Sequence, residues 1–322
     1  MHLKAHTAAL VGMFLLSSTA NAFDLQGHRG TRGLMPENTL PAFEKAIVLG
    51  VTTLETDLAL TKDGVLVLSH DPLLNPDLTR DARGAFLTAH GPAIRTLTFA
   101  ETQTYDVGRL NPASKYAAQW PEQTAVDGTP LPRLADLFAL THRFSPTVRF
   151  NIETKLSPSK PDETADPETF VAAFIAEVRT AGVASRVTLQ SFDWRTLLVS
   201  RRLAPDIATS CLTIDTPTSS TVRPVEGKTS PWLGGLDPTT HGGSIPRVVQ
   251  AAGCSIWSPF WRNIDAASVR EAQALGLKVL PWTVNAPADM AAVIALGVDG
   301  LITDYPDRAH KVLAEKGIVF AR

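Results

Sequence analysis

Residues 53–60 read Thr-Leu-Glu-Thr-Asp-Leu-Ala-Leu, and this stretch decides the fold. Its length and its leucines predict a β-strand, in which Glu55 and Asp57 leave the same face because they lie two positions apart. Burying two acids on one face is costly unless a cation or a base lies opposite them. A barrel strand that points its acids toward a cation fits this pattern. A solvated strand face or an Arg-paired structural site is the alternative.

Short apolar strands of this kind recur along the chain and alternate with amphipathic helical patterns. Further strands are predicted at 24–28, 65–69, 148–154, 187–192, 207–212, 254–258, 278–284 and 300–303. Helices are predicted at 38–49, 134–141, 167–181, 194–203, 245–252, 266–275, 287–296 and 307–316. This alternation indicates βαβ units. Eight such units form a (β/α)8 barrel, an α/β fold whose active sites lie at the carboxyl ends of its strands.

Two irregular stretches interrupt the alternation, at about 72–132 and 213–243, and both are rich in Pro, Gly and Thr. Long loops in a compact domain are usually functional lids or inserted subdomains. We therefore predict two insertions above the barrel mouth, the first of them a subdomain after the second strand region. Residues 23–322 would form one domain, which is an ordinary size for a single barrel.

The first 22 residues have the pattern of a signal peptide. Lys4 precedes an apolar run from Ala8 to Leu16, and Ala20-Asn21-Ala22 is a small-x-small cleavage site. The run is shorter than the ~20 residues that a spanning helix needs, so no stable membrane anchor is expected. We predict cleavage after Ala22 and a periplasmic or secreted protein.

Charge narrows the possible functions of the protein, and the cysteine content leaves two states open. The formal net charge is −2 at pH 7, which argues against nucleic-acid binding because that function needs a basic stripe. The two cysteines, Cys211 and Cys254, lie in apolar, strand-like segments. They could pair in an oxidising compartment, and two buried thiols are the alternative. The sequence leaves the oligomeric state open.

Three carboxylates indicate a divalent cation. Glu55 and Asp57 share one strand face, and Glu153 lies beside Lys155 on one face of the strand predicted at 148–154. Hard divalent cations take oxygen ligands, and this set suits Ca²⁺ and Mg²⁺ alike. We predict one such ion, bound by Glu55, Asp57 and Glu153 and completed by water and substrate oxygens.

Two histidines end predicted strands beside charged residues. His28 precedes Arg29, and His70 precedes Asp71. Histidine moves protons near neutral pH, so this pair suits a general acid and a general base, although a structural role is the alternative for either one. Arg29 and Lys155 suit an anionic phosphoryl group. Together with the carboxylates, these residues indicate a metal-dependent phosphodiesterase.

Other side chains end strands on the far side of the predicted barrel. Phe192 and Trp282 could form a wall for the apolar side of a substrate, or they could pack in the core. Gln190 and Asn285 could hydrogen-bond substrate hydroxyls or phosphate. Ahead of the first helix, Asn38 or Thr39 is expected to cap it, and Glu37 could reach the metal or the substrate.

In their order and spacing, these segments resemble the glycerophosphodiester phosphodiesterase family, from about Gly27 to about Ala309. The matching motifs are Gly27-His28-Arg29-Gly30, Pro36-Glu37-Asn38-Thr39, Glu55-Thr56-Asp57, His70-Asp71-Pro72, Glu153-Thr154-Lys155, Trp282-Thr283-Val284-Asn285 and Gly300-Leu301-Ile302-Thr303-Asp304-Tyr305-Pro306. Residues 156–168 are similar to the exported bacterial members. The resemblance implies a TIM barrel with an inserted subdomain. It also implies that Glu55, Asp57 and Glu153 bind the metal, that His28 and His70 form the acid-base pair, and that Arg29 and Lys155 contact the phosphate.

The resemblance implies a reaction as well. Members of the family hydrolyse glycerophosphodiesters, such as glycerophosphocholine and glycerophosphoethanolamine, to glycerol 3-phosphate and an alcohol. One alternative is a lysophospholipase D or sphingomyelinase D-like phosphodiesterase acting on acylated substrates, which would need a wide apolar channel under the insertions. A second alternative is a binding protein built on a barrel that has lost catalysis.

Overall fold

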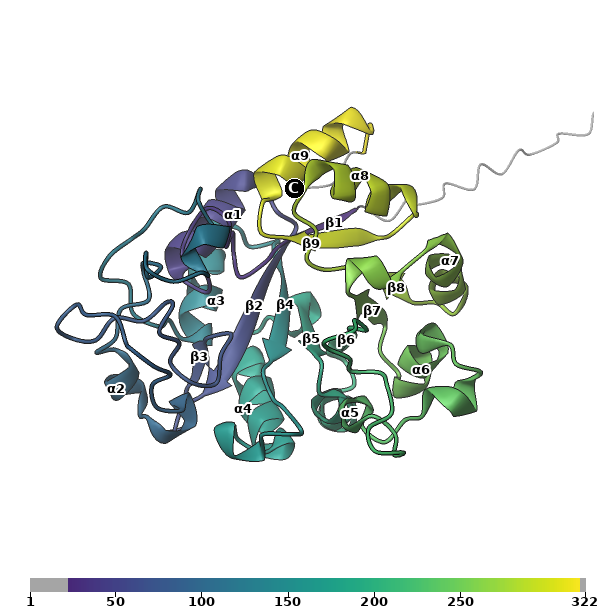
Figure 1. Cartoon of the computed structure of the whole chain (residues 1–322), viewed down its shortest axis with the longest axis horizontal. Coiled ribbons are helices and arrows are strands. Elements are labelled where there is room, and N and C mark those ends of the chain that lie inside the picture. The colour runs from purple at the N-terminus through teal and green to yellow at the C-terminus, as the bar shows by residue number, and fades with distance from the viewer. Residues whose placement is uncertain (1–22, 319–322) are drawn as a thin grey trace, which may run out of the picture.

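The structure is a computed structural model that describes residues 23–318, so the signal peptide predicted at 1–22 lies outside the described residues. Its centre is a barrel of parallel strands in the order β9-β1-β2-β4-β5-β6-β7-β8 (Figure 1). The barrel strands are β1 (Asp24–Gly27), β2 (Thr53–Leu60), β4 (Arg149–Thr154), β5 (Val187–Ser191), β6 (Ala208–Thr213), β7 (Ile256–Pro259), β8 (Lys278–Val279) and β9 (Gly300–Thr303). The (β/α)8 fold predicted from the sequence is confirmed.

The barrel closes between β8 and β9. The regular part of β8 has two residues, although the sequence predicted a strand over 278–284. Pro281 interrupts the strand because it has no N–H to donate. The neighbouring backbone still bonds across the gap, since Trp282 donates to the carbonyl of Pro259 (3.1 Å) and Ile302 donates to that of Pro281 (3.0 Å). These bonds hold the segment after β8 at the mouth of the barrel.

Helices cover the outside of the barrel, one after each barrel strand. They are α1 (Leu40–Leu49), α3 (Leu134–Phe144), α4 (Pro167–Thr180), α5 (Trp194–Leu203), α6 (Ile245–Ala252), α7 (Ala266–Ala274), α8 (Pro287–Ala295) and α9 (Pro306–Glu315). Their apolar faces pack on the strands, for example through the fully buried Phe43, Phe138 and Trp194. No helix within residues 23–318 combines the length and the apolar character that crossing a membrane requires.

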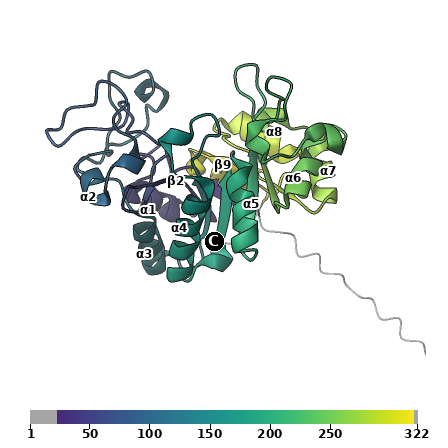
Figure 2. The ribbon, with the colours of Figure 1, turned by 90° about the horizontal axis from the view of Figure 1, so that it is seen from below.

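The first irregular segment begins at a hairpin. Strand β3 (Leu66–Leu68) runs antiparallel to the end of β2, and Gly64 (φ 80°) allows the tight turn between them. The segment up to α3 contains the short helix α2 (Phe99–Thr102) and has its own apolar cluster, which includes Val67, Leu74 and Ile94. Figure 2 shows that this segment and the one between β6 and α6 rise from the same end of the molecule.

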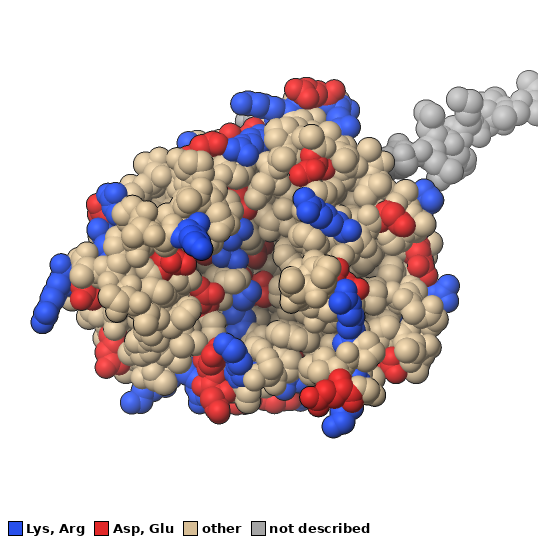
Figure 3. All heavy atoms as spheres, viewed as in Figure 1, with Lys and Arg blue, Asp and Glu red and all other residues tan. Residues whose placement is uncertain are grey.

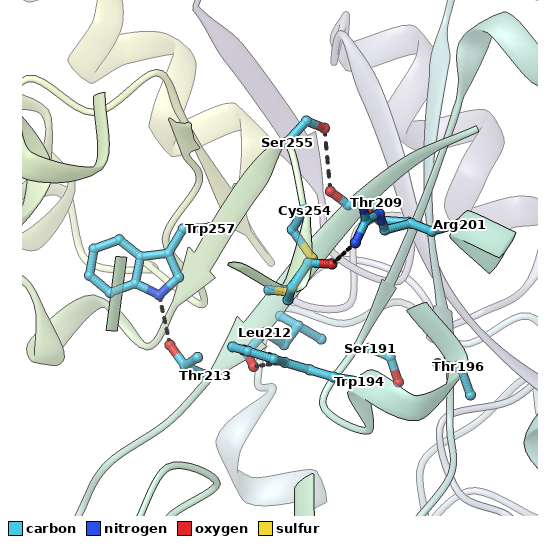
Figure 4. Close-up of a disulfide and its surroundings, with 12 residues drawn as sticks. Ser191, Trp194, Thr196, Arg201, Thr209, Leu212, Thr213, Cys254, Ser255 and Trp257 are labelled. Atoms are coloured by element: carbon cyan, nitrogen blue, oxygen red, sulfur yellow. Dashed lines mark hydrogen bonds between the residues drawn. A yellow bond between two sulfur atoms is a disulfide. The ribbon is translucent and has the colours of Figure 1, made fainter. Parts of the chain in front are cut away.

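Cys211 on β6 and Cys254 just before β7 form a disulfide, with their Cα atoms 6.0 Å apart (Figure 4). Both residues are buried. The bridge links two neighbouring barrel strands and lies near Trp194 and Trp257. Of the two states left open by the sequence, the structure contains the paired one.

Loss of this disulfide should destabilise the barrel. The bridge closes a loop with a sequence separation of 43 residues, and the chain-entropy model then assigns it about 4 kcal/mol. We expect the double variant Cys211→Ala/Cys254→Ala to lose roughly that much unfolding free energy in a urea titration, compared with the oxidised wild type. Equal midpoints for the two proteins would show that the bridge does not stabilise the fold.

Candidate active site

The turn after β1 carries two of the predicted site residues, His28 and Arg29. Arg29 has a left-handed backbone (φ 49°), and Gly30 follows at φ 83°. A Cβ on Gly30 would lie 2.8 Å from Ala42, so only glycine fits here without a shift of helix α1. In this turn the Arg29 N–H donates to Glu55 Oε2 (2.8 Å), which joins the turn to β2.

The three predicted metal ligands meet at the carboxyl ends of β2 and β4. Parallel pairing places Asp57 opposite Glu153, and Glu55 shares the face of Asp57. One carboxylate oxygen of each residue lies within 4.8 Å of those of the other two, and all three residues are buried. The structure therefore brings together residues that are almost a hundred positions apart in the chain.

Residues 37, 38 and 39, just before helix α1, have three separate structural roles. Thr39 caps helix α1 by accepting from the Ala42 N–H. Asn38 donates to Asp57 Oδ2 (3.0 Å) and so orients that carboxylate. Glu37 accepts from Arg29 Nη1 (2.6 Å) and lies outside the metal cluster, where it holds the guanidinium in place.

The hydrogen bonds within the protein do not satisfy every oxygen of the carboxylate cluster. Asp57 Oδ1 is buried without a hydrogen-bond partner. Burial, together with the charge of Asp57, raises the pKa of Glu55 well above its usual range, and burial raises the pKa of Glu153 to about 7 although Lys155 opposes this. Burial would also raise the pKa of Asp57, but Arg29 and other cationic neighbours outweigh it and lower that pKa. Clustered oxygen donors, one of them without a hydrogen-bond partner, fit a hard divalent cation, so Glu55, Asp57 and Glu153 form a candidate metal site.

His28 is held by a buried acid that the sequence did not single out for a role. Its Nδ1 lies 2.7 Å from Oδ1 of Asp304, which directly follows β9, and its Nε2 faces Glu55 at 3.9 Å. Burial lowers the pKa of His28 to about 4, even though the Asp304 carboxylate favours the protonated ring. The imidazole is therefore neutral near pH 7 in the protein without ligands.

His70 lies where the first irregular segment begins, and it lines the same cavity as His28, Glu55 and Glu153. Its Nδ1 lies 2.9 Å from Asp71 Oδ1, and its side chain is 31% exposed. Burial and the positive charges of Arg29 and Lys155 hold the pKa of His70 well below its usual range. The two histidines thus line the same cavity as Glu55 and Glu153, each with one ring nitrogen fixed by an aspartate.

Asp304 accepts hydrogen bonds from further side chains behind His28. Arg32 donates to both of its oxygens (2.8 and 3.0 Å), and Asn285 donates to Oδ2 (2.6 Å). Arg32 stacks on Trp120 at 4.3 Å from the ring centroid, and Tyr116 donates to Glu37. The first irregular segment therefore supplies aromatic residues that fix the two arginines of the site, and no periodic pattern in the sequence identifies them.

The other predicted substrate contacts differ in where they lie. Gln190 lines the cavity, but its amide donates to Glu55 Oε1 (2.7 Å) and so orients a candidate metal ligand. The Asn285 amide donates to Asp304, behind the cavity. Phe192 and Trp282 do form a wall of the cavity, with ring centroids 5.2 Å apart, and Lys155 Nζ lies 5.8 Å from the centre of the Phe192 ring.

These side chains surround a cavity of about 240 Å³ at the barrel mouth, which we call the inner cavity. It is lined by His28, Arg29, Arg32, Glu55, His70, Glu153, Lys155, Gln190, Phe192, Leu212, Trp282, Thr283 and Ile302. Figure 3 shows the corresponding hollow at the centre of this face, where cationic and acidic side chains gather. Lys155 Nζ lies 2.9 Å from Glu153 and 3.8 Å from Asp57, so positive and negative groups alternate around the space.

Comparison with known proteins agrees with this geometry. The model of the Glycerophosphoryl diester phosphodiesterase family matches residues 28–308, which include every site residue described above. The chain belongs to this family. The glycerophosphodiester phosphodiesterase of Bacillus subtilis (strain 168) is 28% identical over 290 residues, covering 88% of this chain and 84% of that protein. The one from Caldanaerobacter subterraneus subsp. tengcongensis is 26% identical over 292 residues, covering 90% and 97%.

Solved structures of glycerophosphodiester phosphodiesterases share the barrel. A structure from Silicibacter pomeroyi DSS-3 assigned to the glycerophosphoryl diester phosphodiesterases has a TM-score of 0.82 and 35% identity, covering 94% of this chain and 96% of that one. The Oleispira antarctica phosphodiesterase in complex with the product sn-glycerol-3-phosphate has a TM-score of 0.65 at 20% identity, covering 90% and 96%. The enzyme described here is thus a phosphoric diester hydrolase on the family's barrel.

Asp304 should act as a positioning residue through His28. In Asp304→Asn the ring loses its anionic partner, so we expect kcat to fall by roughly tenfold or more, within the range that acid-base catalysis contributes. The pKa of His28 should fall further, because the carboxylate stabilises the protonated ring. The limb of the pH–rate profile set by His28 should then move to lower pH. A profile that keeps its shape and position would show that Asp304 does not act through His28.

Proposed function

We propose that the enzyme hydrolyses glycerophosphodiesters to glycerol 3-phosphate and an alcohol, with one divalent cation, Ca²⁺ or Mg²⁺, bound by Glu55, Asp57 and Glu153. The observation that carries this proposal is the buried carboxylate cluster, two of whose members, Glu55 and Glu153, line one cavity together with two aspartate-held histidines. A bound cation would neutralise charge on the phosphate and lower the pKa of a bound hydroxyl. The product complex of the Oleispira antarctica relative supports glycerol 3-phosphate as the product.

The side chains of this site would divide the remaining work. Arg29 and Lys155 line the inner cavity and would bind the phosphate oxygens. His28 and His70 would form the acid-base pair, one taking the proton of the attacking hydroxyl and the other protonating the leaving alcohol. In the simplest scheme the substrate's own glycerol hydroxyl attacks phosphorus and the alcohol leaves. Water then opens the resulting cyclic phosphate to glycerol 3-phosphate.

Two alternatives predicted from the sequence are less well supported. A lysophospholipase D or sphingomyelinase D-like enzyme needs a wide apolar channel for an acyl chain, whereas the inner cavity has only about 240 Å³ and carries charged and histidine side chains beside its apolar wall. A barrel without catalysis does not explain why two histidines, two carboxylates and three cationic groups line one cavity. We therefore favour small, water-soluble glycerophosphodiesters.

Metal affinity should depend on pH through Glu153 and Glu55. Since burial raises the pKa of Glu153 to about 7 and that of Glu55 well above its usual range, an ion must displace protons there, and affinity should rise with pH by up to about tenfold per pH unit for each proton released. Without an ion, the folded state holds the Glu153 proton more tightly than the unfolded chain. Its contribution to stability therefore falls as pH rises from the ordinary value of 4.5 through about 7. Titrating Ca²⁺ or Mg²⁺ calorimetrically between about pH 5 and 8 tests this, and a pH-independent affinity would contradict it.

A substrate comparison tests the proposed function. Purified enzyme with added Ca²⁺ or Mg²⁺ is offered glycerophosphocholine and, in parallel, lysophosphatidylcholine. We expect glycerol 3-phosphate from the first substrate at a much higher kcat/KM than any lysophosphatidic acid from the second. The reverse order would favour the lysophospholipase D alternative, and turnover of neither would contradict the proposal.

Export from the cytoplasm is part of the same proposal. The signal-peptide pattern at 1–22 is one support, and the disulfide between Cys211 and Cys254 is another, because structural disulfides persist mainly in oxidising compartments. Fractionation of cells that produce the full chain tests it. We expect a mature protein beginning at Phe23 in the periplasm or medium, and an unprocessed protein in the cytoplasm would contradict it.

A further inference from the structure

A second cavity, of about 220 Å³, adjoins the inner cavity, and we call it the outer cavity. The two cavities share His70, Glu153, Lys155 and Phe192, so they meet at one histidine and beside the candidate metal site. A phosphate bound at Lys155 would therefore have space on two sides. One of its two ester substituents would lie in the inner cavity, and the other would lie in the outer cavity.

The walls of the outer cavity come from three different loops, and each is tethered. Asp71 begins the first irregular segment and accepts from Asn75 (2.6 Å). Glu163 lies in the loop between β4 and α4, where Arg95 Nη1 donates to the backbone carbonyl of Asp162 (2.7 Å). Trp232 comes from the segment between β6 and α6, next to the fully buried Leu233. Because each loop is held by its own contacts, the walls are in place before a ligand binds.

The side chains of these walls suit a ligand group that combines a positive charge with apolar surface. Trp232 and Phe192 supply aromatic rings, and aromatic faces attract cations, including quaternary ammonium groups. Asp71 and Glu163 supply carboxylates, with side chains that are 29% and 28% exposed. Lys160 also borders the cavity and pairs with Glu163 (3.0 Å), but its side chain is 63% exposed, so it lies at the rim.

We propose that the outer cavity binds the leaving alcohol of the substrate and favours alcohols that carry an ammonium or quaternary ammonium group. This inference rests on the proposed function, since it names the alcohol of the same diester. The phosphate would lie against both Lys155 and the adjoining candidate metal site, and the positive end of the alcohol would lie between Trp232 and the two carboxylates. Glycerophosphodiesters with a neutral alcohol would lack this second contact.

The test compares two diesters that share the glycerophosphate half. Glycerophosphocholine carries a quaternary ammonium, and glycerophosphoglycerol carries a neutral alcohol of similar size. For the wild type we expect a higher kcat/KM with glycerophosphocholine. In Trp232→Leu and in Glu163→Gln, kcat/KM for glycerophosphocholine should fall roughly tenfold, in line with a partly desolvated cation–aromatic or charge contact, while glycerophosphoglycerol changes by less than about twofold. The kcat/KM for glycerophosphoethanolamine shows whether a primary ammonium is preferred as a quaternary one is.

Two matched variants control for general damage to the loops. Trp232→Phe keeps an aromatic ring and should retain most of the preference for glycerophosphocholine. Glu168→Gln removes a nearby acid whose exposed side chain pairs with Arg202, outside both cavities, and it should leave both substrates unaffected. Equal losses on the two diesters in Trp232→Leu and Glu163→Gln, or no loss on either, would overturn the assignment of this cavity. Failure of the proposed function would look different, because the wild type would then hydrolyse neither diester.

Discussion

Alanine at His70 is expected to lower kcat for glycerophosphocholine by about a hundredfold or more, and alanine at His28 should do the same, because each would remove one partner of the acid-base pair. Both rings face the inner cavity, and each is oriented by an aspartate, Asp71 or Asp304. Proton transfer requires a group at a fixed place, and a water molecule in the vacated space would lack the orientation that the aspartate gives to the ring. Steady-state kinetics at saturating metal ion measures this loss.

His142→Ala is the matched control for these variants. His142 lies on α3, on the outside of the barrel, and is exposed. The control should keep full activity. If both histidines act in one scheme, the double variant His28→Ala/His70→Ala should lose less than the product of the two single losses. Near-normal turnover in His70→Ala would contradict its proposed role.

The second large effect is expected from the carboxylate cluster. Asp57→Asn should lose roughly a thousandfold in kcat/KM, because charge stabilisation by a metal ion contributes several kcal/mol and each 1.4 kcal/mol is a factor of ten. Asparagine has almost the same shape, and its amide oxygen can still accept from Asn38. The variant therefore mainly removes the negative charge of the Asp57 carboxylate, whose Oδ1 is buried without a hydrogen-bond partner.

Metal binding gives this variant a readout that is independent of catalysis. An ion that binds only the folded protein raises its stability, by about 2.7 kcal/mol at a hundred times the dissociation constant. We expect Ca²⁺ or Mg²⁺ to raise the thermal midpoint of the wild type and to leave that of Asp57→Asn nearly unchanged. Asp206→Asn, a change at an exposed acid paired with Arg179, should respond like the wild type. A full thermal response in Asp57→Asn would show that the ion binds elsewhere.

The sequence is informative where function follows a strand. Residues two apart on β2 must share a face, and parallel pairing then sets Asp57 opposite Glu153, so the carboxylate cluster could be predicted from periodicity and fold class together. The ends of elements were less predictable. Helix α1 starts at Leu40 because Thr39 caps it, and regular pairing of β8 stops at Val279, just before Pro281.

Contacts between distant segments were beyond sequence reasoning. His28 and Asp304 are separated by 276 positions, and they meet because β1 and β9 are neighbours in the barrel. Tyr116 and Trp120 lie in an irregular segment where no periodicity indicates which side chains turn inward. The same holds for Trp232. For Asn285 and Gln190 the sequence predicted a place near the site but not the bonding partner. Their amides hydrogen-bond Asp304 and Glu55.

The site is divided between the barrel strands and the irregular segments above the mouth. The groups proposed to bind the metal and the phosphate and to transfer protons lie on or just after β1, β2, β3 and β4, and Asp304 follows β9 and lies behind His28. The irregular segments above the mouth contribute Tyr116, Trp120 and Trp232, which fix the arginines or line the outer cavity. Substitutions in the segments should therefore alter substrate preference more readily than substitutions in the barrel, which should alter turnover.

The most direct measurement of the proposed chemistry follows glycerophosphocholine by ³¹P NMR, and free choline by ¹H NMR, with the purified enzyme and Ca²⁺ or Mg²⁺, before and after a chelator is added. We predict that the diester signal is replaced by that of glycerol 3-phosphate, that free choline accumulates in equal amount, and that the conversion stops on chelation and resumes when the ion is restored. Formation of phosphocholine, or hydrolysis that continues unchanged with the ion removed, would contradict the account.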